Sequence, residues 1–513
     1  MLYPIGIQNF EKIREGSYVY VDKTDLIYQI VRTGGYYFLS RPRRFGKSLL
    51  VSTMEAYFQG KKELFKGLAL EKQEKDWTNY PVLHLDLSGK TYNKAEDLEI
   101  TLDQHLRQWE KDCGMEARYP EPDARFKDVI DTAYEKTGKP VVILIDEYDK
   151  PILDSAGNEP LRESYRSRLQ GFYSVMKTRD GKIRFGFLTG ITKLGKLSIF
   201  SGLNNLKDIS MDHRYVDICG ISEDDLHACF DESVREMAEA NGLSKEECYA
   251  KLKDRYDGYH FSRNSADIYN PFSLLNALDQ QEFKDYWYET GTPTFVVKAL
   301  KRGQFNLEDL TLEGVPASAL TGVNADDSDP IPVLYQSGYL TIQSYDERWE
   351  RYSLKYPNKE VERGFMEGLA RIYTPSLSYN SPFDVRKFVE DFEKGDTEGL
   401  MKRFEAFFAD ADYEIVGDAE LYFQNTMYVL CKLMGQYTQV ERHTSNGRMD
   451  IVVQTDKYIY IMELKMDATA DDALKQIEEK GYAKPFAADP RKLFKIGIGF
   501  SSETRRIKEW QIS

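Results

Sequence analysis

The sequence predicts a multidomain α/β protein whose N-terminal part contains a parallel β-sheet. The first observation is length, because 513 residues exceed the roughly 100–200 residues of a typical domain. The second is that short apolar segments alternate with amphipathic helical stretches through residues 1–220, which is the pattern of βαβ units. The third is a change in pattern: residues 221–395 are mostly charged and helical, and residues 396–513 return to an α/β pattern. We therefore predict three domains with these bounds.

Apolar runs locate the strands of the N-terminal sheet. Segments 36–40, 82–87, 141–149 and 183–190 have the apolar character of buried strands, and 214–219 is a candidate fifth strand. In the C-terminal part, the pattern predicts a helix, a hairpin, a second helix and a strand. These four elements cover residues 418–435, 449–465, 471–482 and 492–500.

Composition excludes several classes of protein. Apolar residues make up 41% of the chain, which is typical of folded proteins rather than disordered ones. No apolar run reaches the ~18 residues of a membrane helix, and the first residues do not resemble a signal peptide. The five cysteines form no C-x-x-C pair, so we expect reduced thiols in a cytoplasmic protein.

The charge pattern bears on nucleic acid as a partner. A net charge of −15 argues against a surface that is basic throughout, but it does not exclude a local basic cleft. Segment 491–510 carries an excess of Lys and Arg, which either faces phosphates or forms a solvated surface.

A loop after the first predicted strand has the residues of a phosphate-binding site. In "FLSRPRRFGKSLL" (38–50), the end of the pattern G-x-x-x-x-G-K-[ST] is present, whereas Arg41 stands at its first glycine. A helix that begins near Gly46 offers unpaired N–H groups to a phosphate. Lys47 would reach the β- and γ-phosphates of a nucleotide, and the Ser48 hydroxyl would bind Mg²⁺. The candidate nucleotide-binding residues of this loop are Arg44, Phe45, Gly46, Lys47 and Ser48.

The third predicted strand ends in carboxylates, at the edge where parallel sheets bind ligands. In "VVILIDEYD" (141–149), Asp146 would hold Mg²⁺ through water and Glu147 would polarise the attacking water. The alternative is a Rossmann-like fold with incidental acids. At the end of the fourth strand, Thr189 is either a sensor of the γ-phosphate or an ordinary strand-end residue. The helix after the acidic strand carries candidates for an arginine finger, which are otherwise solvated residues: Arg162, Arg166 and Arg168.

A second group of charged residues interrupts an apolar hairpin in the C-terminal part. In "GRMDIVVQTDKYIYIMELK" (447–465), a turn centred between Asp456 and Lys457 places Asp450 opposite Glu463. Glu463 and Lys465 are two residues apart, so they share one face of the strand. Two carboxylates and an ammonium group suit metal-assisted hydrolysis of a phosphodiester. The alternative is a surface hairpin with a cross-strand lysine and scattered acids.

Two flanking helices add to this set. Glu420 lies early on the predicted helix before the hairpin and would complete a metal site. Gln476 and Lys480 share one face of the helix after the hairpin, which would bring Gln476 over the acids. The candidate catalytic residues of the whole chain are Glu147, Asp450, Glu463, Lys465 and Gln476, and the candidate metal ligands are Ser48, Asp146, Glu420, Asp450 and Glu463.

Several segments resemble one family. "YVDKT" (20–24), "LIDEYDKPI" (144–152) and the loop at 38–50 resemble the AAA-ATPase-like domain of bacterial proteins that often end in a PD-(D/E)XK nuclease-like domain. In that family an arginine at the first loop position is usual. Further matching segments are "SIFSGLNNLKDIS" (198–210), "YDGYHF" (256–261), "YNPFSLLNAL" (269–278), "YWYETGTPTF" (286–295) and "LYQSGYLTI" (334–342).

The resemblance implies a fold and a set of sites. It implies a P-loop NTPase core of the additional-strand type, a mostly helical middle region and a C-terminal restriction-endonuclease-like α/β domain. Its implied ATP site consists of Lys47, Ser48, Asp146 and Glu147, and all five nuclease positions are filled by Glu420, Asp450, Glu463, Lys465 and Gln476.

Three functions are consistent with these observations. The first is a protein that binds and hydrolyses ATP and thereby regulates a metal-dependent nuclease, with ATP and Mg²⁺ as cofactors and DNA or RNA as substrate. The second is a nucleotide-gated binding or regulatory module whose nuclease-like domain does not cleave. The third is a plain ATPase with a structural tail. We expect no membrane partner and keep a homo-oligomer open, because ATPases of this class often work through neighbouring subunits.

Overall fold

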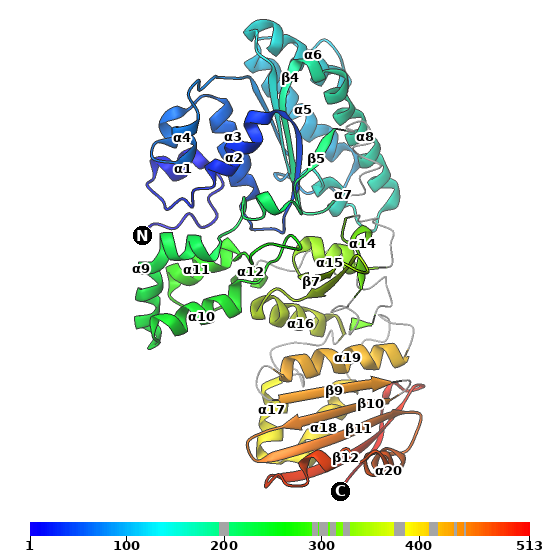
Figure 1. Ribbon diagram of the computed structural model, residues 1–513. Coiled ribbons are helices and arrows are strands. Elements are labelled where there is room, and N and C mark those ends of the chain that lie inside the picture. The colour runs from blue at the N-terminus through cyan, green and yellow to red at the C-terminus, as the bar shows by residue number, and fades with distance from the viewer. Residues whose placement is uncertain are drawn as a thin grey trace. The chain divides into compact units, whose positions relative to one another are not determined.

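The computed structural model describes residues 1–193, 205–289, 296, 306–307, 314–321, 329–373, 385–409, 419–435, 439–445 and 448–513. Within these ranges, the backbone alone is described at 289, 321, 371–373, 409, 419–420, 441–445 and 448–450. The chain divides into two units (Figure 1): unit 1 holds residues 1–299 and 311–362, and unit 2 holds residues 300–310 and 363–513. Within the described ranges, every helix is too short or too polar to cross a membrane.

Unit 1 is built on a five-stranded sheet whose strands all run parallel, in the order β2-β3-β4-β1-β5. The strands are β1 (Gly35–Ser40), β2 (Val82–Asp86), β3 (Val141–Asp146), β4 (Ile183–Gly190) and β5 (Leu206–Asp208). Every residue of β3 is buried, as expected of a central parallel strand covered on both faces. β4 separates β1 from β3, so the order is that of an additional-strand P-loop core. Four of the predicted strands are confirmed.

The fifth predicted strand, at residues 214–219, is wrong. The fifth strand of the sheet is β5, and His213–Tyr215 form the short 3-10 helix η3. The carbonyl groups of Tyr215 and Val216, which a strand would offer to its neighbour, accept hydrogen bonds from the Arg41 side chain instead. A distant arginine therefore overrides the local β-propensity of this segment.

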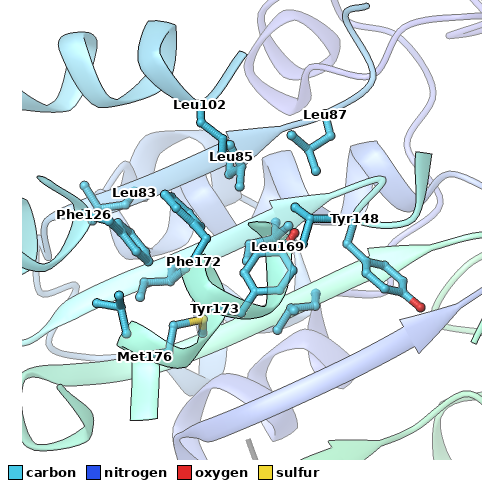
Figure 2. Packing of buried hydrophobic residues seen from close by; sticks show 14 of the residues in the cluster. Leu83, Leu85, Leu87, Leu102, Phe126, Tyr148, Leu169, Phe172, Tyr173 and Met176 are labelled. Atoms are coloured by element: carbon cyan, nitrogen blue, oxygen red, sulfur yellow. The ribbon is translucent and has the colours of Figure 1, made fainter. Parts of the chain in front are cut away.

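Helices cover both faces of this sheet. α3 (Lys47–Phe58) packs on one face against β2, β3 and β4. The other face carries α5 (Ala95–Asp112), α6 (Pro122–Thr137) and α8 (Glu159–Thr178). Figure 2 shows the core on that face, where Leu83 and Leu85 of β2 lie near Phe126 and Phe172, whose rings stack with centroids 4.3 Å apart. Shorter elements are α1 (Phe10–Glu15), α2 (Thr24–Thr33), η1 (Lys62–Phe65), α4 (Ala69–Gln73), α7 (Lys150–Asp154) and η2 (Asp180–Lys182).

The rest of unit 1 is mostly helical, as predicted, but it also contains a small antiparallel sheet in the order β6-β8-β7. Capping boxes at Ser222 and Ser244 start the first two helices. The elements are α9 (Glu223–Asn241), α10 (Lys245–Tyr256), α11 (Pro271–Gln280), α12 (Tyr286–Glu289), β6 (Val315–Pro316), α14 (Ala317–Thr321), α15 (Ile331–Ser337), β7 (Thr341–Asp346), β8 (Arg351–Lys355) and the start of α16 (Lys359–Tyr373).

Unit 2 is built on a mixed five-stranded sheet in the order β13-β12-β11-β10-β9. β11 and β12 run parallel and the other neighbours antiparallel. The predicted helix, hairpin, helix and strand are all present, whereas the polar sequences of β9 and β13 gave no strand prediction. The elements are α17 (Val385–Lys394), α18 (Thr397–Ala409), α19 (Ala419–Met434), β9 (Gln439–Ser445), β10 (Arg448–Gln454), β11 (Tyr458–Met466), α20 (Ala470–Lys480), η5 (Lys484–Phe486), β12 (Lys492–Ser501) and β13 (Arg506–Ile512).

Candidate functional site

The loop between β1 and α3 has the backbone of a phosphate-binding site. Gly46 is the N-cap of α3 and adopts a left-handed conformation with φ of 87°, which glycine tolerates without strain. Because the N-cap has no side chain, the first N–H groups of α3 have no side-chain cap. Together with the partial positive charge of the helix end, these groups make this point of unit 1 suited to an anion.

Arg41 stabilises this loop. It stands at the position of the first glycine of the pattern. Its guanidinium group is buried, and it donates hydrogen bonds to the carbonyls of Ser210 (2.8 Å), Tyr215 (3.2 Å) and Val216 (3.3 Å). Lys47 is also buried, and its Nζ donates to the carbonyl of Arg41 at 3.0 Å. A glycine at position 41 would leave these carbonyls without their donor, so the arginine has a structural role in this chain.

The acidic end of β3 lies beside this loop. Burial raises the pKa of the Asp146 carboxyl, while a hydrogen bond with Ser48 and the charge of Lys47 act against that shift. Glu147 follows in a left-handed conformation with φ of 50°, and burial raises its pKa as well. Such a backbone costs a non-glycine residue roughly 1–2 kcal/mol. The loop and the strand end thus bring Lys47, Ser48, Asp146 and Glu147 together, as predicted.

A third acid at this edge, Asp149, was not among the predicted site residues. It is 1% exposed, and its carboxylate accepts hydrogen bonds from Ile191 N (3.1 Å), Thr192 N (2.6 Å) and Thr192 Oγ1 (2.7 Å). It therefore fixes the end of β4 to the end of β3. The signal for it was present in the sequence, because it is the next acid after Glu147 in the string "DEYD".

The side chains of two predicted residues, Thr189 and Phe45, are buried against other parts of unit 1. The hydroxyl of the buried Thr189 donates a hydrogen bond to the Leu39 carbonyl at 2.9 Å, which connects β4 to β1. The Phe45 ring is buried against Tyr259, with ring centroids 4.8 Å apart. The three arginines of α8 form ion pairs with acids and do not line the cavity at the loop: Arg162 with Glu159, Arg166 with Glu163 and Arg168 with Glu99.

A cavity of about 750 Å³ opens at the loop, a size typical of small-molecule sites. One part of its wall is polar and includes Arg43, Lys47, Ser48 and Glu147. Another part is apolar and was not predicted, because it comes from the N-terminal segment and from α11, far along the chain. These apolar residues are Pro4, Ile5, Ile7, Pro271, Phe272 and Leu275.

The "VDKT" segment has a structural role in unit 1. Asp22, just before the N-cap residue Lys23 of α2, accepts hydrogen bonds from the Thr24 amide at 2.9 Å and from the Thr24 hydroxyl at 2.6 Å. Lys23 is largely buried and forms ion pairs with Asp217 (3.1 Å) and with Asp225 (2.5 Å) in the first turn of α9. The segment thus attaches the N-terminal part of unit 1 to the helices that follow the parallel sheet.

In unit 2 the predicted register of the hairpin is confirmed. Asp450 of β10 is the direct partner of Glu463 in β11, and Lys465 lies two residues further along β11. Positions 450, 463 and 465 therefore share one face of the sheet. Glu463 is fully buried, and its Oε1 accepts a hydrogen bond from Nε2 of Gln476 on α20. Lys465 Nζ donates to the Asp472 carbonyl at 3.1 Å.

Part of the predicted nuclease set lies outside the described side chains. The structure describes the backbone of Glu420 and Asp450, but not their side chains. Among the side chains it does describe, no group of three or more His, Cys, Asp or Glu residues is placed to hold a metal ion. The roles of Glu420 and Asp450 as metal ligands therefore stay predictions.

The basic segment 491–510 is partly neutralised. Arg491 bonds to Asp489 at 2.7 Å and to Gln454 at 2.9 Å, and Lys495 pairs with Glu478. These two cations therefore stabilise unit 2 itself. Arg506 and Lys508 in β13 are exposed.

The sheet order, the loop and the acidic strand end define a P-loop NTPase core, and two family models agree with the two-part organisation. A model described as predicted AAA-ATPase matches residues 4–200, and a model of the PD-(D/E)XK nuclease superfamily matches residues 418–510. The chain belongs to the family of AAA-ATPase-like proteins with a C-terminal PD-(D/E)XK nuclease superfamily domain. It is 36% identical over 515 residues to an "Uncharacterized protein in vnfD 5'region" of Azotobacter chroococcum mcd 1, a match that covers 98% of this chain and 97% of that protein.

Proposed function

We propose that unit 1 binds ATP together with Mg²⁺ and hydrolyses it. The observation that carries this proposal is the proximity of Ser48, at the start of α3, to the Asp146 carboxylate at the end of β3, whose pKa is raised by burial and lowered by both Ser48 and Lys47. A hydroxyl and a carboxylate are the hard oxygen ligands that Mg²⁺ prefers. The Lys47 charge acts on the same carboxylate, and the cavity at this point has the volume of a nucleotide site. The residues present therefore fit both the nucleotide and the metal.

Each of these residues would have a separate role in hydrolysis. The first amides of α3 and the Lys47 ammonium group would bind the phosphate oxygens, while Ser48 and Asp146 would hold the metal. Mg²⁺, when bound, supplies neutralisation of the charge that develops on the phosphates. Glu147, whose pKa is raised by burial, would orient the attacking water and accept its proton.

The test separates ATP binding from hydrolysis. In Glu147→Gln, ATP binding measured by calorimetry stays close to that of the unaltered chain, while phosphate release falls at least about 100-fold. Glu135→Gln, on the exposed face of α6, is the matched control and leaves both unchanged. Phosphate release by Glu147→Gln at the unaltered rate would contradict the role of this residue.

We also propose that unit 2 is a metal-dependent phosphodiesterase that acts on nucleic acid. The register that pairs Asp450 with Glu463 and sets Lys465 on the same face supports it. Glu463 is buried in an apolar sheet, a costly position for a carboxylate, and Gln476 donates a hydrogen bond to it. This arrangement is unusual for a surface hairpin with scattered charges.

The chain's own groups would act as follows. Glu420, Asp450 and Glu463 would hold the metal, and Gln476 would orient the Glu463 carboxylate. Mg²⁺, when bound, lowers the pKa of a water molecule and stabilises the negative charge that develops on the phosphate in the transition state. Lys465 would position the nucleophile on the scissile phosphodiester.

The alternative for unit 2 is binding without cleavage, as part of a nucleotide-gated regulatory module. Purified full-length chain would be incubated with Mg²⁺ or Mn²⁺ and with single- and double-stranded DNA and RNA, and cleavage would be compared with Asp450→Ala. Metal-dependent cleavage that disappears in this variant supports the phosphodiesterase. Binding of nucleic acid with no cleavage under either metal supports the alternative.

A further inference from the structure

Four residues of the loop each rest on an aromatic ring from the part of unit 1 that follows the parallel sheet. The rings belong to segments that resemble the family and for which the sequence alone suggests no role. We call Tyr259, Phe261, Phe272 and Trp287 the collar. Its contacts, as distances to the ring centre, are Arg41 with Phe261 (4.1 Å), Arg43 with Trp287 (5.0 Å), Arg44 with Phe272 (4.9 Å) and Phe45 with Tyr259 (4.8 Å between centroids).

Trp287 is bonded to the loop at one end and to α16 at the other. Its indole Nε1 donates to the Arg43 carbonyl at 3.2 Å, and its ring lies under the Arg43 guanidinium group. Its backbone N–H donates to Oε1 of Glu360 at 2.6 Å. Trp287 and Glu360 are both almost fully buried, and Glu360 lies in the first turn of α16. A shift of Trp287 therefore alters contacts at both the loop and α16.

The arginines of the loop differ in whether a phosphate in the cavity could reach them. Arg43 and Arg44 line the cavity, and each is held over a ring by a cation–π contact. Arg41 does not line the cavity and is fixed by backbone carbonyls. A phosphate in the cavity offers Arg43 and Arg44 a charge-assisted hydrogen bond, which competes with their cation–π contacts. It leaves Arg41 in place.

We propose that Arg43 binds the phosphates of the nucleotide and that Trp287 positions Arg43. Nucleotide binding then shifts Trp287 and thereby alters its hydrogen bond with Glu360. The proposal rests on the proposed ATP site. It assigns Arg43 a contact with the ligand and gives Trp287 a positioning role. Glu360 lies two residues before the end of unit 1 at Glu362, and its helix, α16, continues to Tyr373. The contact that changes is therefore made by a helix whose later residues belong to unit 2.

The test uses the fluorescence of single tryptophans in the full chain. The four tryptophans other than Trp287 are replaced by Phe, and a second chain keeps Trp109, in the core between α5 and α6, as the only tryptophan. Calorimetry measures ATP binding independently, with Mg²⁺ present. At saturating ATP we expect the emission of Trp287 to change in intensity and wavelength and that of Trp109 to stay constant.

Substitution of Arg43 gives the second measurement. We expect Arg43→Gln, in the otherwise unaltered chain, to raise the Kd for ATP about tenfold through loss of a charge-assisted hydrogen bond, and to abolish the Trp287 response in the single-tryptophan chain. The matched control is Arg32→Gln, because Arg32 also lies over a ring, that of Tyr28 at 5.9 Å, but outside the cavity. It should leave the Kd and the response unchanged.

Each other outcome overturns the proposal. If ATP binds by calorimetry but Trp287 emission is constant, or if Arg43→Gln binds ATP as the unaltered chain does, the role of the collar is wrong and the ATP site stands. If calorimetry detects no ATP binding by the unaltered chain, the result contradicts the proposed ATP function and, with it, the proposed roles of Arg43 and Trp287.

Discussion

The two candidate sites are held in place in different ways. In unit 1, the partners of the loop lie far along the chain: Arg41 bonds to residues 169–175 positions away, and Trp287 bonds to Arg43 across 244 positions. In unit 2, Gln476 bonds to Glu463 across 13 positions and Lys465 to Asp472 across 7. The loop depends on packing of the whole unit, whereas the side-chain contacts described at the unit 2 site come from one hairpin and the helix after it. Substitutions should therefore have effects that reach further in unit 1 than in unit 2.

The largest expected effect is on ATP turnover. Lys47→Ala removes the ammonium group that we expect to bind phosphate, so kcat/KM for ATP should fall at least about 100-fold in a phosphate-release assay. Lys61→Ala, which removes an exposed ion pair with Glu11, is the control and should retain the unaltered rate. Equal turnover in Lys47→Ala and in the control would remove the loop from the proposed mechanism.

The next effect tests whether distant contacts hold the loop. Arg41→Gly restores the first glycine of the general pattern, yet it leaves buried carbonyls without a donor, so we expect the free energy of unfolding to fall by roughly 3 kcal/mol. Urea titration of the full chain would measure it, and Arg41→Lys, which keeps one cation, should lose less. An Arg41→Gly chain as stable as the unaltered one would break the contrast between the two sites.

The pH dependence of unit 1 gives a smaller effect. Burial raises the pKa of Glu360 to about 8, so the folded state binds a proton that the unfolded state has released. Stability should therefore fall as the pH rises from about 5 to 8, by up to about 1.4 kcal/mol per pH unit from this group. Denaturation of Glu360→Gln at several pH values should show a weaker slope over that window. An identical slope would mean that Glu360 does not titrate in it.

The smallest effect is in unit 2. Gln476→Leu removes one donor to the buried Glu463, and we expect a loss of about 1 kcal/mol in unfolding free energy. Lys475→Leu, at the exposed neighbouring position of α20, should change stability by less. Because the contact is local, Gln476→Leu should leave ATP binding by unit 1 unchanged, and a large change there would contradict the account.

The same difference explains what the sequence predicted. The register of Asp450 with Glu463 and the approach of Gln476 follow from alternation in a hairpin and from helix spacing, which are local rules. The strand at 214–219 was mispredicted because Arg41, far away, takes its carbonyls. Neither Phe272 in the cavity wall nor Trp287 against the loop has a local signal, since only the fold brings them to the loop.

The most direct test of the account couples its two halves. The rate of nucleic-acid cleavage by the full chain would be measured with Mg²⁺, with and without ATP, in the unaltered protein, in Lys47→Ala and in Lys465→Ala. We predict that ATP changes the rate in the unaltered chain and not in Lys47→Ala, and that Lys465→Ala cleaves under neither condition. Cleavage by Lys465→Ala at the unaltered rate, or an unchanged ATP effect in Lys47→Ala, would contradict the account.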